Sequence, residues 1–382
     1  MPKPPYILGI ETSCDETAVA LVDAHGAVRA NVVASQASLH ARFGGVVPEV
    51  ASRRHLEVCL PLVDSVLIDS GPVGWEDIEA LAVTQGPGLV GCLLIGVETA
   101  KALAWRHEKP LIAVHHLEAH LQAPFLLPEA ADAAHLLIED GRAGPAIPFA
   151  DDRPTDDAVG AQPDFPHVGL IISGGHTSLV RVEAPGRCRP LAQTRDDAVG
   201  EAYDKVARLL GLGYPGGPVI DRLAAEGDAS RFAFTAPLWR RDTRDFSFSG
   251  LKTAVARAVD ALTGGNGNAE PAAVPDTAAV RDLCASFQRV AVNTLLGKAF
   301  REAESASVRD LVIVGGVAAN QGLRRAAAAG SPPGLRVWFP HLSLCTDNAA
   351  MIAGLAWHLR PLEPAAALGL NPSASLPFTP IG

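Results

Sequence analysis

Residues 6–23, YILGIETSCDETAVALVD, and residues 167–183, HVGLIISGGHTSLVRVE, share one pattern. In each, an apolar run rich in β-forming residues leads into a short polar turn, and a second apolar run follows. This pattern predicts a strand, a hairpin turn and another strand. Because the two hairpins lie far apart in the chain, they predict a duplicated α/β fold with one hairpin in each lobe. Their turns offer backbone N–H groups and hydroxyls that can hold a phosphate.

Length and composition agree with a two-lobed globular protein. The chain has 382 residues, too many for one ordinary core, and it is 48% hydrophobic and 19% charged. No apolar run approaches the length of a membrane span, and the start MPKPPYILGIE lacks the pattern of a signal peptide. The cysteines are scattered without a Cys-x-x-Cys pair, which is typical of free thiols. We therefore expect a cytoplasmic protein.

The net charge of −10 argues against a free-standing nucleic-acid binder, because neutralising phosphates supplies much of the affinity of such proteins. If the chain binds RNA, the basic surface must be local or must come from a partner. Arginine clusters of this size are also common on ordinary solvated surfaces. The clusters that could form a local basic surface are Arg53 and Arg54, Arg240, Arg241 and Arg244, and Arg324 and Arg325.

The segment LIAVHHLEAHLQAP, residues 111–124, places two histidines four residues apart. On a helix, His116 and His120 then share one face and can bind a divalent metal, although such pairs also occur in solvent or in hydrogen-bonded cores. A zincin protease needs Glu directly after the first His, whereas here Glu118 comes two residues after it. The inverted protease motif fails as well, because Ala119 follows that glutamate.

Three further segments combine a turn with a predicted helix. In VIVGGVAANQGLR, residues 312–324, Asn320 stands near a helix start and can reach a ligand. In SLCTDNAAMIAGLAW, residues 343–357, Asp347 is either a helix cap or a third metal ligand. The turn GPGLVG, residues 86–91, precedes a predicted helix, and a glycine-rich turn at a helix start can form an anion site. Alternatively, Gly91 and Gly96 would allow another helix to approach closely. A helix over 49–69 is expected to break or kink at Pro61.

Two segments of low complexity suggest the domain layout. Residues 128–165 are rich in Ala, Asp, Pro and Gly, and we expect a poorly ordered acidic insertion there. Residues 262–276 form a second such loop. The predicted layout is an N-terminal lobe over 1–127, completed by the C-terminal helix at about 347–382, and a C-terminal lobe over 166–346.

Taken together, the motifs resemble those of the TsaD family, the bacterial tRNA N6-adenosine threonylcarbamoyltransferases once described as O-sialoglycoprotein endopeptidases. The resemblance covers nearly the whole chain outside the two low-complexity segments. Tyr203 stands where the family pattern suggests Phe, a mild departure. The matching segments, in order, are GIETSCDETAVA, GGVVPEVASRRH, TQGPGLVG, VHHLEAHLQAP, LIISGGHTSLV, GEAYDKVARLLGLGYPGGP, FSFSGLKTAV, VGGVAANQGLR and CTDNAAMIA.

The resemblance implies the two-lobed fold of actin, sugar kinases and heat-shock chaperones (ASKHA), with a cleft between the lobes. It implies one divalent metal per subunit, iron (Fe²⁺) or zinc, held by His116, His120 and Asp347. It also implies transfer of a threonylcarbamoyl group from threonylcarbamoyl-adenylate to N6 of the adenosine beside the anticodon, position 37, in tRNAs reading codons that begin with A. AMP is released. The implied partners are a TsaB-like paralogue and a TsaE-like ATPase.

The resemblance also assigns site residues. A base is needed to accept the proton of the adenine amine, and Glu16 and Asp15 in the first hairpin turn suit that role, with Ser13 beside them. The TsaB-like subunit is expected to dock on the N-terminal lobe over GPGLVGCLLIGVETAKALA. The positions implied to bind the adenylate are Ile171, Ile172, Ser173, Gly174, Gly175, Asp204, Gly217, Asp221 and Asn320.

Three other functions fit parts of the sequence. A metalloprotease lacks its glutamate at the required spacing. A sugar or acetate kinase of the same fold would use ATP and magnesium without a His-x-x-x-His site. A non-catalytic scaffold of the same superfamily would lack the histidine pair, which this chain retains.

Overall fold

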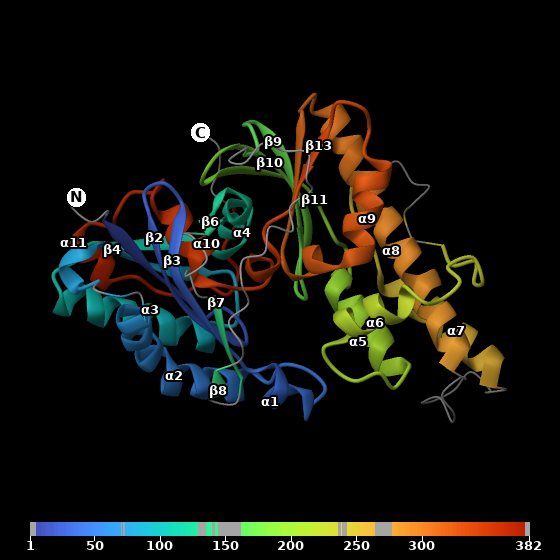
Figure 1. Cartoon of the computed structure of the whole chain (residues 1–382), viewed down its shortest axis with the longest axis horizontal. Coiled ribbons are helices and arrows are strands. Elements are labelled where there is room, and N and C mark those ends of the chain that lie inside the picture. Colours follow the sequence, from blue (N-terminus) through green and yellow to red (C-terminus); the bar gives the residue numbers. More distant parts are fainter. Residues whose placement is uncertain are drawn as a thin grey trace. The chain divides into compact units, whose positions relative to one another are not determined.

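Two compact units make up the chain in the computed structural model (Figure 1). The first unit comprises Met1–Gln162, Glu183–Arg189 and Pro340–Gly382, and the second comprises Pro163–Val182 and Pro190–Phe339. The residues that the structure describes are 5–69, 71, 73–128, 135–139, 142–143, 162–235, 238, 243–263 and 277–378.

The sheet of the first unit is built around the first predicted hairpin. Its strands follow the order β5-β4-β1-β2-β3, with β7 and β8 continuing beyond β3 and β6 pairing with β3 off that path. β1 runs antiparallel to β2 and parallel to β4, which is in turn parallel to β5. The strands are β1 (Tyr6–Glu11), β2 (Glu16–Asp23), β3 (Ala27–Ser35), β4 (Ile78–Gly86), β5 (Leu111–His115), β6 (Leu127–Pro128), β7 (His135–Glu139) and β8 (Arg142–Ala143).

The sheet of the second unit repeats this plan around the second hairpin. Its order is β11-β10-β9-β12-β13, with β9 antiparallel to β10 and parallel to β12. Each of its strands thus takes the position of its counterpart in the first sheet, which confirms the predicted duplication. The strands are β9 (His167–Ile172), β10 (Thr177–Ala184), β11 (Arg187–Gln193), β12 (Asp310–Val314) and β13 (Arg336–Trp338).

In the first unit, α2, α3, α4 and α10 contact strands of the sheet, whereas in the second unit α8 contacts β9 and β12 and the other helices pack mainly on one another (Figure 1). Short 3₁₀ turns occupy 75–77, 123–125, 316–319 and 342–344. In the first unit the helices are α1 (Ala37–Ala41), α2 (Pro48–Asp69), α3 (Val90–Arg106), α4 (His116–Gln122), α10 (Ala349–Ala356) and α11 (Pro364–Leu368). In the second they are α5 (Val199–Leu209), α6 (Gly216–Ala224), α7 (Ser249–Thr263), α8 (Thr277–Ser305) and α9 (Gln321–Gly330).

Both faces of the first sheet are buried. Leu8 and Leu21 point to one face, where they pack with residues of α2 and α3, and Ala20 points to the other, where it packs with residues of α10. Gly9 allows α10 to lie directly on β1, because an added Cβ would stand 2.5 Å from the carbonyl oxygen of Ala349. The start of α10 is thereby held next to the end of β1.

Two expectations from the sequence are wrong. The helix does not break at Pro61, because α2 runs without interruption from Pro48 to Asp69 with the Pro61 side chain on its exposed side. Within the expected acidic insertion, 135–139 form β7, which pairs in parallel with β3, because HLLIE is a short run of Leu and Ile inside a segment otherwise rich in Ala, Asp, Pro and Gly. Residues 144–161 and 264–276 lie outside the described residues. No helix in the described part of the chain is long and apolar enough to cross a membrane.

Candidate metal and transfer site

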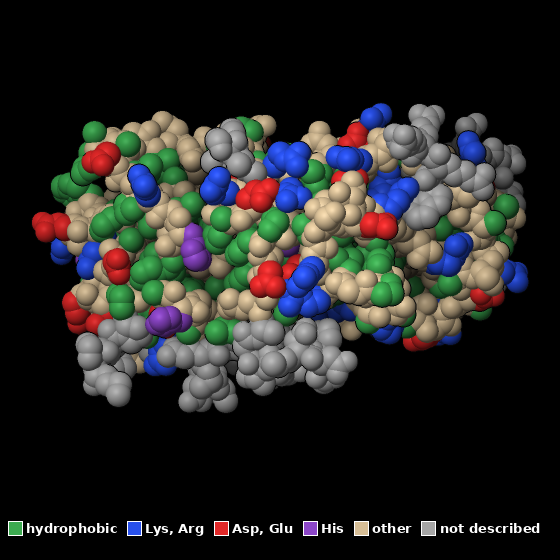
Figure 2. Space-filling model, turned by 90° about the horizontal axis from the view of Figure 1, so that it is seen from above, with side chains coloured by type: hydrophobic (Ala, Val, Ile, Leu, Met, Phe, Trp, Pro, Cys, Tyr) green, Lys and Arg blue, Asp and Glu red, His purple; other side chains and the backbone are tan. Residues whose placement is uncertain are grey.

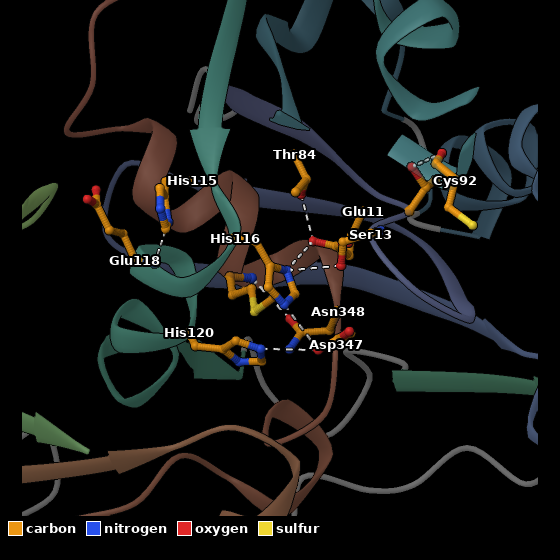
Figure 3. A network of polar contacts seen from close by, with 12 residues as sticks. Glu11, Ser13, Thr84, Cys92, His115, His116, Glu118, His120, Asp347 and Asn348 are labelled. Atoms are coloured by element: carbon orange, nitrogen blue, oxygen red, sulfur yellow. Dashed lines mark hydrogen bonds and ion pairs between the residues drawn. The ribbon is translucent and has the colours of Figure 1, made fainter. Parts of the chain in front are cut away.

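Three polar side chains meet where parallel strands of the first sheet end. Glu11 ends β1, Thr84 stands near the end of β4, and His116 directly follows β5. The carboxyl ends of parallel strands lie at one edge of a sheet, which is the usual ligand site of open α/β sheets. Here the His116 Nδ1 atom lies 3.0 Å from Glu11 Oε2 and 3.2 Å from the Ser13 hydroxyl, and Thr84 Oγ1 donates to Glu11 Oε2 at 2.6 Å (Figure 3).

On its other side, His116 faces the predicted metal ligands. Its Nε2 atom lies 3.6 Å from Asp347 Oδ1, and His120 Nε2 lies 3.1 Å from the same oxygen (Figure 3). One donor atom from each residue lies within 4.8 Å of the others. Ligands bonded at about 2.1 Å to one tetrahedral ion would be about 3.4 Å apart, so these side chains fit a shared metal. The imidazoles are buried, whereas the Asp347 side chain is 19% exposed, so solvent reaches the cluster beside the aspartate.

Helix caps hold the ligands in place. The His115 side chain accepts a hydrogen bond from the Glu118 backbone N–H and so starts α4, the helix that carries both histidines. At α10 the cap is Asn348, whose Oδ1 accepts from the Met351 N–H and whose Nδ2 donates to the Thr346 carbonyl. Asp347 therefore is not needed as a cap, and its carboxylate is available to the cluster.

The cluster carries several mutually repelling carboxylates. Burial, followed by repulsion from Asp15 and Asp347, raises the pKa of Glu16 well above its usual value. Burial acts to raise the pKa of Glu11, but the adjacent His116 outweighs burial and lowers that pKa. Burial acts to lower the pKa of His116, whereas Asp347 and Glu11 raise it to about 9. A divalent cation would offset this concentration of negative charge.

The first hairpin turn holds the expected catalytic residues. The Ser13 hydroxyl contacts His116, and Glu16, the first residue of β2, accepts a hydrogen bond of 3.5 Å from Ser35. His55 of α2 holds this turn in place through both ring nitrogens. Its Nδ1 atom lies 2.7 Å from Thr17 Oγ1, and its Nε2 atom lies 2.9 Å from the backbone carbonyl oxygen of Cys14. Neither His55 nor Glu11 was identified from the sequence.

The expected adenylate-binding residues all belong to the second unit. Ile171 and Ile172 end β9 and are buried, and the turn after them is closed by the Ser173 N–H, which donates to the His176 carbonyl. A Cβ added at Gly174, Gly175 or Gly217 would meet no heavy atom within 4 Å. The backbone at these glycines is therefore open to an incoming ligand.

The polar members of this set hold helix starts in position. Asp204 accepts from the Gly216 N–H at 2.8 Å, and Asp221 accepts from the first backbone N–H groups of α9 at 2.7 and 3.1 Å. Asn320 caps α9 and donates to Gln288, which in turn donates to Asp221. Gln288 thus links two expected ligand residues, a role that the sequence did not reveal because Gln288 lies within the long α8.

A sequence profile of the TsaD family, tRNA N6-adenosine threonylcarbamoyltransferase, matches residues 27–151 and 155–354. The chain belongs to the TsaD family. A relative from Sorangium cellulosum is 49% identical over 91% of this chain and 89% of its own length. One from Anaeromyxobacter dehalogenans is 47% identical over 92% of this chain and 93% of its own length. Both are named tRNA N6-adenosine threonylcarbamoyltransferase.

The fold also resembles a solved structure of low sequence identity. Full-length HypF, in its phosphate- and nucleotide-bound form, aligns over 97% of this TsaD chain and 47% of its own length, with a TM-score of 0.50 and 14% identity. Such a likeness concerns the fold alone. With the duplicated sheets, it confirms the predicted ASKHA fold class. Family membership sets aside the protease, kinase and scaffold alternatives.

Proposed function

We propose that this TsaD chain transfers the threonylcarbamoyl group of threonylcarbamoyl-adenylate to N6 of adenosine 37 in tRNAs that read codons beginning with A. The family match over most of the chain carries the proposal. The cluster of His116, His120 and Asp347 at the sheet edge supports it. The new bond joins N6 to the carbamoyl carbon, the bond from that carbon to the phosphate oxygen breaks, and AMP leaves.

The metal is proposed to be iron (Fe²⁺) or zinc, held by His116 and His120 through nitrogen and by Asp347 through oxygen. Imidazole and carboxylate ligands suit either ion. When bound, the ion supplies a Lewis acid that can polarise the carbamoyl carbonyl or orient the threonyl group.

Binding of the adenylate and acceptance of the amine proton are assigned to side chains and backbone groups of the chain itself. The open backbone of Gly174 and Gly175 suits the phosphate of the leaving AMP, because N–H groups there can stabilise its charge. Asp204 and Asp221 suit the ribose hydroxyls. Burial strengthens Glu16 as a proton acceptor for the N6 amine, with Asp15 as the neighbouring alternative.

A partner is proposed to help bring tRNA to the chain. The net charge is −10, and Figure 2 shows Lys and Arg side chains mixed with Asp and Glu on the face drawn. Arg54, one of the expected basic residues, is paired with Glu57. Since unscreened repulsion weakens binding of a polyanion, the isolated chain should bind tRNA weakly and turn over poorly. A TsaB-like paralogue and a TsaE-like ATPase are the proposed helpers.

The proposed docking face for the paralogue lies on α2 and α3 of the first unit. Large apolar side chains are exposed there, which is a feature of interaction surfaces. Gly91 is exposed among them. Gly96 is not part of this face: it is buried, and a Cβ there would collide with Thr12, so its small size serves packing within the chain. The exposed apolar residues are Leu56 at 68%, Leu60 at 53%, Val90 at 56% and Leu94 at 44%.

The test is nucleoside analysis of tRNA incubated with this chain, its partners, the donor-forming enzyme, threonine, bicarbonate and ATP. We expect N6-threonylcarbamoyladenosine at position 37 over many turnovers, and little product when the partners are left out. tRNA affinity is measured at one fixed salt concentration, with and without partners. Absence of the modified nucleoside from the complete mixture would refute the transferase proposal, and tight tRNA binding with sustained turnover by the lone chain would refute the need for partners.

A further inference from the structure

Glu11 is a carboxylate at the end of a central strand with 0% of its surface exposed. Burying a carboxylate is costly unless hydrogen bonds and a positive partner compensate. Here the Thr84 hydroxyl and the Ser13 backbone N–H donate to its two oxygens, and His116 is its ion-pair partner (Figure 3). These contacts leave the carboxylate little freedom to rotate.

The contact with Glu11 determines which tautomer the His116 imidazole adopts. A carboxylate oxygen 3.0 Å from Nδ1 favours a proton on that nitrogen, which then donates to Glu11. The lone pair of the neutral ring is then on Nε2, the nitrogen that faces Asp347. A carboxylate in this position also increases the basicity of the imidazole as a metal ligand.

His120, the second histidine of the cluster, is not oriented by a hydrogen bond of this kind in the described part of the chain. His120 is fully buried, and its Nδ1 atom has no hydrogen-bond partner within the described residues. Of the two imidazoles, only that of His116 is oriented from behind by a carboxylate. Loss of the Glu11 contact should therefore not be compensated elsewhere in the ligand set.

We propose that Glu11, held by Thr84, is the positioning residue of the metal site. It sets the tautomer and orientation of His116 and thereby the affinity of the cluster for a divalent cation. The inference rests on the proposed metal ligands, but it does not depend on transferase activity. Outer carboxylates of this kind typically change metal affinity 10- to 100-fold.

The experiment measures Zn²⁺ and Co²⁺ affinity of the full chain by chelator competition, with the visible absorption of bound Co²⁺ as a second readout. Glu11→Gln should weaken affinity about 10- to 100-fold and alter the Co²⁺ spectrum. Thr84→Val, which keeps the carboxylate but removes its hydroxyl donor, should weaken affinity less. Thr84→Ser, which restores the hydroxyl, should return affinity to the wild-type value.

Thermal unfolding of the metal-free proteins separates positioning from folding. A Glu11→Gln variant that melts at a lower temperature but binds both metals as tightly as wild type would overturn the proposal, since Glu11 would then serve only the fold. If Glu11→Gln does not fold, the proposal is tested with Thr84→Val and Thr84→Ser instead. Equal metal affinity in Thr84→Val and wild type would then contradict the proposal. If the wild-type chain itself binds no stoichiometric metal, the metal site fails, which is a separate result from failure of the transferase reaction.

Discussion

His116 and His120 show how far local spacing carries a prediction. Their separation by four residues is enough to place both on one face of α4, and the structure brings both to Asp347. The partners behind them could not be found in the same way. Glu11 and Thr84 reach His116 only because β1, β4 and β5 lie side by side, which is a property of the sheet order and not of any one segment.

The first prediction concerns His120→Ala. It removes one of three proposed ligands, so the purified chain should lose stoichiometric metal. The fold should survive, because all three ligands lie in the first unit, whose core is formed by other residues. Elemental analysis of the variant checks this, with His25→Ala, at an exposed turn residue, as the matched control. Full metal occupancy in His120→Ala would contradict the ligand assignment.

His167 provides a pH-dependent prediction. It is fully buried at the start of β9, and burial lowers its pKa from 6.5 to about 4. Below pH 6.5 the unfolded chain binds a proton that the folded chain does not bind until about pH 4. Stability should therefore decrease as the pH falls through this window, by up to about 3 kcal/mol from this group.

The measurement is the thermal unfolding midpoint of the second unit at pH 7.5 and pH 5.0. His167→Asn retains a donor for the Asp164 carbonyl, which lies 3.1 Å from Nδ1 in the native chain, but cannot be protonated in this range. Its midpoint should fall less between the two pH values than that of wild type. An equal fall in both proteins would show that another group controls the acid sensitivity.

At the scale of elements, β7 shows why composition alone misjudged 128–165. The segment is rich in Asp, Pro and Ala as a whole, but strand formation depends on a few adjacent residues, and HLLIE pairs along β3. From composition alone, deleting about 133–162 would be expected to change activity little. Because that deletion also removes β7, we now expect it to uncover the edge of β3 and to lower stability.

Two deletions test this difference. Removing 144–161, which contains no described strand, should leave the melting temperature and tRNA modification close to wild type. Removing 133–162 should lower the melting temperature and promote aggregation, since an uncovered strand edge can pair with other chains. Both are followed by thermal unfolding and light scattering. If the longer deletion is as stable as the shorter one, β7 contributes nothing to the sheet.

For the whole molecule, the duplicated hairpins were sufficient to predict two similar α/β lobes, while the ASKHA fold class was implied by the family resemblance. Each hairpin is a local pattern, and its repetition indicates two similar lobes. The sequence analysis also assigned the C-terminal helix, at about 347–382, to the first lobe, but it did not reveal the contact by which the chain, returning at Pro340, brings α10 onto β1 and Asp347 to the histidines. That return depends on the close approach permitted by Gly9, which no periodicity in the sequence reveals.

The last prediction concerns assembly with the TsaB-like paralogue. Gly91 is exposed on the proposed docking face, and an added Cβ would make only ordinary contact, 3.5 Å from Ser52. Gly91→Leu should therefore fold and retain metal, but its larger side chain should obstruct a helix from a second chain and weaken the complex at least tenfold. Gly330→Leu, exposed in the second unit with no atom near its added Cβ, is the matched control. Titration calorimetry with the paralogue measures both affinities, and an unchanged affinity for Gly91→Leu would place the docking face elsewhere.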